Sequence, residues 1–197
     1  MTCDCAPTHI ESAAQRKMLR MALTLNAAMF VIGTLLGYWA QSTGVLADAL
    51  DMLTDAIAYG LALQAASRGA AFKRHSAQYS GLVLLLLGAG IAAQALWRWY
   101  AGSQPVGPAM MAYAVVSFAV NLYVLTKLTR FRHDGVHLSA SYLCTRADVL
   151  ANIAVFVCGG VIVVTGAHWV DLLVGFAIAL YVFKEAGEIL RQARLAR

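Results

Sequence analysis

Three aspartates lie inside an apolar stretch of the chain, in the segment LADALDMLTDA. Asp48, Asp51 and Asp55 occur at positions i, i+3 and i+7, which places all three on one stripe of a helix. A charged side chain at the centre of a bilayer costs about 2.5–3.5 kcal/mol even on insertion scales. Three carboxylates on one stripe therefore indicate a functional site, and protonated structural aspartates are the alternative interpretation.

A second polar set follows in the segment SYLCTRADVLAN, where Cys144, Asp148 and Asn152 are spaced at i, i+4 and i+8 on one helix face. Cys144 and Asp148 form a pair one turn apart, as do Asp51 and Asp55. Two such pairs facing each other supply four anionic ligand atoms, which is the chemistry of a tetrahedral Zn²⁺ site, with about 2.3 Å to sulfur and about 2.0–2.2 Å to oxygen. For the cysteine alone, packing of a small buried thiol is the alternative.

The composition indicates a membrane protein. Of 197 residues, 60% are hydrophobic and 13% are charged, with a mean hydropathy of +0.67, whereas a soluble domain has about 25% charged residues. Six apolar segments are long enough to cross a bilayer, and in lipid they must be helices because their backbone groups need internal partners. The segments are 21–41, 44–66, 77–98, 108–128, 138–164 and 169–190. The sequence thus predicts an all-α membrane protein with one six-helix domain, residues 21–190, and two tails, residues 1–20 and 191–197.

Basic residues cluster before the first predicted helix, after the second and fourth, and after the sixth. They are Arg16, Lys17, Arg20, Arg68, Lys73, Arg74, Lys127, Arg130, Arg132, Arg191, Arg194 and Arg197. By the positive-inside rule, both termini and these connections are cytoplasmic. The net charge of +5 then reflects topology and attraction to anionic lipid. No basic stripe extends beyond a loop, so we expect no nucleic-acid partner.

This topology brings the two pairs of candidate ligands to a similar depth. The second helix runs inward and the fifth runs outward, and each pair comes about 6–12 residues after its helix begins. At about 1.5 Å per residue, both pairs lie roughly 9–18 Å below opposite faces of a core about 30 Å thick. The pairs are expected to meet near the middle of the membrane.

These segments carry a family resemblance. LADALDMLTDA resembles the second-helix motif of the cation diffusion facilitator family, and CTRADVLAN resembles its fifth-helix motif. Asn26 and Asp171 match further recurrent positions. The resemblance implies a homodimeric antiporter that exports a divalent metal, most often zinc, in exchange for protons by alternating access. It also implies location in a bacterial inner membrane, with the metal as transported substrate and no organic cofactor.

Carried over residue by residue, the resemblance assigns Asp51, Asp55, Cys144 and Asp148 to the transport site. Cys144 stands where the family usually has histidine. Because thiolate favours soft cations, we expect Zn²⁺ and also Cd²⁺, with Co²⁺ and Ni²⁺ open. Asp48 is expected to support the ligands or relay protons.

Asn152 is assigned the same supporting role. The family's large cytoplasmic C-terminal domain does not follow the sixth helix here, so the sequence is interpreted as a short form that dimerises through its membrane helices. Gly33 and Gly37 form a G-x-x-x-G pattern that either marks a dimer seam or reflects ordinary packing.

The N-terminal tail carries Cys3, Cys5 and His9, which either capture metal at the cytoplasmic mouth or are inert. Cys158 has no partner at ligand spacing and is interpreted as a packing residue. Two other functional classes are alternatives. A membrane-embedded metal-dependent enzyme is disfavoured because the D-G-x-x-A-R opening of the phosphatidyltransferases is absent. An intramembrane metal sensor remains the alternative that a measurement of proton flux would distinguish.

Overall fold

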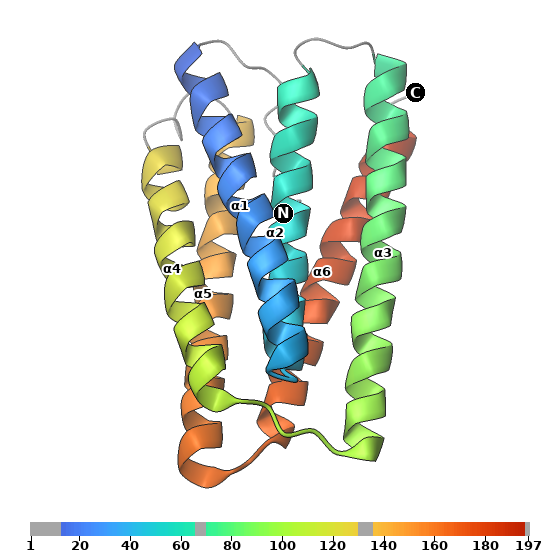
Figure 1. Ribbon diagram of the computed structural model, residues 1–197. Helices are drawn as coiled ribbons and strands as arrows, with labels where there is room; N and C mark the ends of the chain where they lie inside the picture. Colours follow the sequence, from blue (N-terminus) through green and yellow to red (C-terminus); the bar gives the residue numbers. More distant parts are fainter. Residues whose placement is uncertain (1–12, 66–69, 130–135, 196–197) are drawn as a thin grey trace.

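The computed structural model describes residues 13–65, 70–129 and 136–195, and this part of the chain consists of helices without strands. The helices are α1 (Ala13–Trp39), α2 (Thr43–Ala65), α3 (Ala70–Ala101), α4 (Gly107–Thr129), α5 (Val136–Thr165) and α6 (Trp169–Leu195). They run up and down one bundle, with the start of α1 and the end of α6 at the same end (Figure 1). The predicted all-α membrane fold is confirmed. Helices α1 and α3 begin eight and seven residues before their predicted segments, because hydropathy detects the part in lipid while helical hydrogen bonding continues into polar residues.

Four of the six described helices are long and apolar enough to cross a membrane. The spans lie within α1, α3, α4 and α5. The other two helices carry acidic side chains that are buried within the bundle, namely Asp48, Asp51 and Asp55 on α2 and Asp171 and Glu185 on α6. Their polarity is thus directed inward, as expected for ionisable groups in membrane helices.

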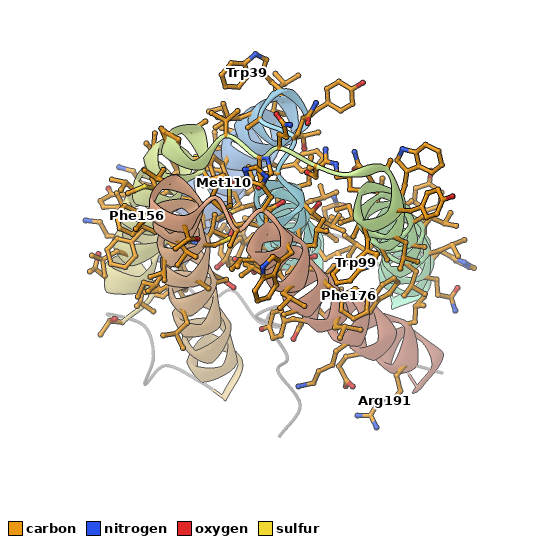
Figure 2. All side chains as sticks on the ribbon, turned by 90° about the horizontal axis from the view of Figure 1, so that it is seen from below. Trp39, Trp99, Met110, Phe156, Phe176 and Arg191 are labelled. Carbon is orange, nitrogen blue, oxygen red and sulfur yellow. The ribbon has the colours of Figure 1, made fainter. Side chains whose placement is uncertain are left out.

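Aromatic residues mark one end of the bundle. All four tryptophans of the chain, Trp39, Trp97, Trp99 and Trp169, lie where α1 and α3 end and α6 begins, and each is 55–68% exposed. Tryptophan favours the membrane–water interface, where an amphipathic ring contacts both phases. This end of the bundle, seen face-on in Figure 2, is therefore an interface. The sequence predicts that it is the outer one, and the orientation of the termini stays a prediction.

The second helix is the central element of the bundle. Helix α2 contacts each of the five other helices, and every residue from Ser42 to Met52 is buried. Seen from the tryptophan end, α4 and α5 lie on one side, α3 and α6 on the other, and α1 and α2 between them (Figure 2). The Ser42 hydroxyl caps the start of α2 by accepting a hydrogen bond of 3.1 Å from the Val45 backbone N–H. The aspartates of α2 are thus held inside the protein.

The G-x-x-x-G pair of α1 packs against other helices of the same chain. Gly33 and Gly37 are both buried. A Cβ atom on Gly33 would lie 2.5 Å from the Tyr113 hydroxyl oxygen and 2.8 Å from the Ala49 Cβ, and one on Gly37 would lie 2.9 Å from the Leu46 Cγ. The glycines permit the close approach of α1 to α2 and α4, so the interpretation as a dimer seam is wrong.

A methyl group at Gly33 should therefore destabilise the fold. We expect Gly33→Ala to lower the unfolding free energy by about 1–3 kcal/mol, because overpacking displaces neighbouring side chains. Thermal unfolding in detergent measures the effect. Gly90→Ala is the matched control, since a Cβ there meets nothing within 4 Å, and alanine should be neutral or stabilising in a helix. An unchanged unfolding temperature in Gly33→Ala would contradict the packing described above.

Two apolar clusters enclose a polar layer. One cluster includes Met29 of α1, Met52 of α2 and Ala114 of α4, and the other includes Ala22, Tyr59 and Val124 of the same helices. On each helix a polar residue lies between the two clusters. These residues are Asn26 on α1, Asp55 on α2, and Ser117 and Asn121 on α4. The bundle thus has a polar layer with hydrophobic packing on either side.

Candidate intramembrane metal site

Three of the four predicted metal ligands are described, and they meet between α2 and α5. Asp51, Asp55 and Asp148 are 7%, 8% and 4% exposed. The Asp148 side chain lies within hydrogen-bonding reach of the carboxyl groups of both Asp51 and Asp55. Carboxylates this close in a dry interior cannot all remain ionised without a proton or a cation between them. The arrangement suits a group of acids that binds either.

The fourth predicted ligand, Cys144, lies one helical turn before Asp148 on α5, and its side chain is outside the described residues. The candidate capture residues Cys3, Cys5 and His9 also lie outside them. Among the described side chains, no group of three or more His, Cys, Asp or Glu is already arranged to hold a metal ion. The complete ligand set therefore stays a prediction.

Asp48, the remaining aspartate of α2, contacts α4. The Ser117 hydroxyl donates a hydrogen bond of 3.2 Å to Asp48 Oδ2, and the Tyr113 hydroxyl lies beside the same carboxyl group. Asp48 Oδ1 is buried and has no hydrogen-bond partner among the described residues. Asp48 thus belongs to a contact between α2 and α4, one turn from the group of Asp51 and Asp55.

Asn152, the other predicted supporting residue, is 1% exposed. Its side-chain Nδ2 donates a hydrogen bond of 2.7 Å to the backbone carbonyl of Asp148, one turn earlier on α5. Its Oδ1 is buried without a partner in the described part of the chain. The amide therefore lies directly beside the candidate ligand, with one acceptor atom unused.

Comparison with known proteins identifies the family. The chain matches the cation efflux transmembrane domain over residues 19–196. It belongs to the cation efflux family. Relatives of this domain include the metal cation efflux system protein CzcD of Cupriavidus metallidurans, 25% identical over 94% of this chain. The zinc transporter ZitB of Yersinia pestis is 24% identical over 93% of this chain.

The cadmium, cobalt and zinc/H(+)-K(+) antiporter of Bacillus subtilis is 22% identical over 91% of this chain. The matches cover 63%, 62% and 62% of the lengths of these three relatives, so the chain spans somewhat under two thirds of each. Family membership and the apolar helices together identify an integral membrane protein.

One acidic residue of the cation efflux domain was missed in the sequence. Glu185 on α6 is 7% exposed and lies close enough to act electrostatically on both Asp51 and Asp55. It adds a further acidic side chain beside this group of carboxylates. In the sequence Glu185 follows Lys184 near the end of the predicted sixth helix, 169–190, and the sequence alone assigned it no role in the site. No local pattern marks it as part of the site.

The tryptophan end of the cation efflux domain holds a further buried carboxylate, Asp171 in the first turn of α6. Asp171 Oδ1 accepts hydrogen bonds from the Ser42 hydroxyl at 2.6 Å and the Gly44 backbone N–H at 3.0 Å, and Oδ2 accepts one from the Thr43 backbone N–H at 2.6 Å. Arg98 of α3 donates to the Thr43 hydroxyl at 3.1 Å. Asp171 therefore caps α2 from another helix.

Proposed function

We propose that the protein exports divalent metal cations, zinc and cadmium first among them, from the cytoplasm in exchange for protons. The observation that carries the proposal is the contact of Asp148 on α5 with Asp51 and Asp55 on α2, inside a membrane domain of the cation efflux family. Ionisable groups in membrane helices mark ion or proton pathways. We further infer a homodimer in a bacterial inner membrane, in keeping with the bacterial relatives.

The exchange follows from the chemistry of the ligands. A carboxylate or thiol binds metal when deprotonated, so protons and metal compete for the same atoms. When the site opens toward a more acidic compartment, protons displace the metal from Asp51, Asp55 and Asp148. The protonated carboxyl groups are neutral, and the low-dielectric interior holds neutral groups at a smaller cost than charged ones while the protein changes which side its site faces. The site therefore returns with protons and binds metal again on the cytoplasmic side.

The supporting residues have separate roles in this scheme. Asp48 accepts a hydrogen bond from Ser117, which leaves its other oxygen available to pass a proton between the outer half of the bundle and Asp51. Asn152 donates to the Asp148 backbone and keeps this turn of α5 in a fixed position. Both act on the ligand groups rather than on the metal.

Cys144 should set the metal preference. Thiolate selects soft cations such as Cd²⁺, whereas imidazole suits Zn²⁺, Co²⁺ and Ni²⁺. We expect Cys144→His to reduce transport of cadmium relative to zinc by about tenfold, since one soft ligand is replaced. The relatives named above are described as acting on zinc, cadmium and cobalt, which makes these three ions the first set to compare. An unchanged order of metals in Cys144→His would show that the thiol is not a ligand.

Metal-driven proton flux tests the proposed function. The purified protein is reconstituted in liposomes that contain a pH-sensitive dye, and zinc, cadmium, cobalt, nickel or manganese is added outside. Zinc- or cadmium-driven proton movement above that of protein-free liposomes is the expected result. Folded protein that binds metal but moves no protons would overturn the antiporter and indicate a sensor.

A further inference from the structure

We propose that Asn121 on α4 is a positioning residue for the candidate ligand Asp148: when the site binds metal, its amide donates to one carboxylate oxygen so that the other faces α2. The inference rests on the metal site of the proposed function and extends it to a helix that carries none of the predicted ligands. Three observations support it, namely the face of α4 on which Asn121 lies, the register between α4 and α5, and the atoms that lack partners.

Asn121 continues a polar stripe that faces α2. Tyr113, Ser117 and Asn121 occur at i, i+4 and i+8 of α4 and are 3%, 0% and 0% exposed. Ser117 donates its hydrogen bond to Asp48 of α2, so this face of α4 looks toward α2. Helices α2 and α4 run in the same direction (Figure 1). One turn beyond Ser117, Asn121 therefore lies level with the part of α2 that follows Asp48 and carries the candidate ligands.

The packing of α4 against α5 brings Asn121 level with Asp148. The two helices are antiparallel and lie side by side (Figure 1). Their register is fixed at Gly159, where a Cβ would lie 2.8 Å from the Met111 Cγ and 2.9 Å from the Gly107 carbonyl oxygen. Asn121 comes ten residues after Met111, and Asp148 comes eleven residues before Gly159. Counted in opposite directions from one contact, the two residues reach the same height.

The side chains of Asn121 and Asp148 at this height carry an unpaired hydrogen-bond donor and an unpaired acceptor. Both amide atoms of Asn121, Nδ2 and Oδ1, are buried and have no hydrogen-bond partner among the described residues, and the same is true of Asp148 Oδ2. A buried polar group without a partner costs about 1–3 kcal/mol. The amide N–H is a donor and the carboxylate oxygen an acceptor. The two atoms are not hydrogen-bonded to each other in this structure. A hydrogen bond formed between them on metal binding would remove both deficits and orient the carboxylate, as residues that support metal ligands do.

Metal binding to the full chain in detergent tests the assignment without reference to transport. Asn121→Leu has a similar volume and lacks the amide. We expect its zinc Kd to rise about 10–100-fold, the usual cost of losing a residue that orients a ligand. The visible spectrum of bound Co²⁺, which depends on ligand geometry, should also change. Thr129→Val is the matched control, because the Thr129 hydroxyl bonds to the backbone of its own helix at Leu125; its Kd should stay within about twofold.

A second variant covers the case in which Asn121→Leu does not fold. Asn121→Ser is smaller and keeps a donor, so it should give an intermediate Kd. Wild-type Kd and Co²⁺ spectrum in a folded Asn121 variant would overturn the inference, and so would an equal loss in Thr129→Val. The measurements of metal binding and of proton flux test the two proposals separately. Wild-type protein that binds zinc without moving protons contradicts the proposed antiporter alone, whereas proton flux with unchanged affinity in Asn121→Leu contradicts the role of Asn121 alone.

Discussion

Replacing Asp51 with alanine should abolish metal-driven proton movement. Asp51 is buried on α2 and contacts Asp148 of α5, so its removal deletes a proposed ligand and a proton-carrying group together. We expect the flux with zinc or cadmium to fall about 100-fold or more, to the leak of protein-free liposomes, because loss of a ligand costs more than loss of the groups that orient it. The pH-dye assay in liposomes measures the change.

Two variants make this result specific. Asp51→Asn keeps the shape of the side chain but cannot become anionic, and it should lose flux to a similar degree. Glu188→Ala removes an acid outside the polar layer, one that forms an ion pair of 3.0 Å with Arg191 on the same helix, and its flux should stay near that of wild type. Substantial flux in both Asp51 variants would place the transport site elsewhere.

Replacing Asp171 with asparagine should strongly destabilise the protein. Both oxygens of Asp171 accept hydrogen bonds, from two backbone N–H groups at the start of α2 and from the Ser42 hydroxyl. An asparagine offers one acceptor oxygen, and its NH₂ group would face an N–H donor. We expect a loss of about 2–5 kcal/mol in unfolding free energy, because at least one buried donor loses its partner and two donors oppose each other. Thermal unfolding in detergent, followed by circular dichroism, measures it.

The size of the effect should depend on which donor is affected. Ser42→Ala removes one of the three hydrogen bonds to Asp171 and leaves both backbone donors paired, so we expect a loss of about 0.5–1.5 kcal/mol. Arg98→Gln removes a donor to Thr43 at the edge of the same network and should rank with it. An Asp171→Asn protein as stable as Ser42→Ala would contradict the cap on α2.

The helical architecture could be predicted because hydropathy and helical spacing are local properties. The stripe of Asp48, Asp51 and Asp55 was visible in the sequence, and so was its likeness in spacing to the pair of Cys144 and Asp148. In the structure, Asp148 does approach Asp51 and Asp55. The set of ligands that holds the metal depends on side-chain geometry. The sequence alone therefore gives only a prediction of that set.

The remaining features depend on tertiary register, which the sequence does not encode locally. Ser117 and Asp48 are 69 residues apart and pair because α2 and α4 pack at one particular height. Glu185 lies near the end of the predicted sixth helix, where no motif marks it, yet the bundle brings it near the site. Gly33 and Gly37 left two interpretations open in the sequence, and the structure supports the one of packing within this chain.

The placement of the four tryptophans has a practical consequence for every experiment in vesicles. Because all four lie at one end of the bundle, the intrinsic fluorescence of the protein reports on a single face of the membrane. A membrane-impermeant quencher such as iodide, added outside, quenches the tryptophan fluorescence of the molecules whose tryptophan end faces outward. The quenched fraction therefore counts the two orientations in the same liposomes that serve for transport. The metal flux measured in these liposomes can then be compared with the fraction of molecules in each orientation.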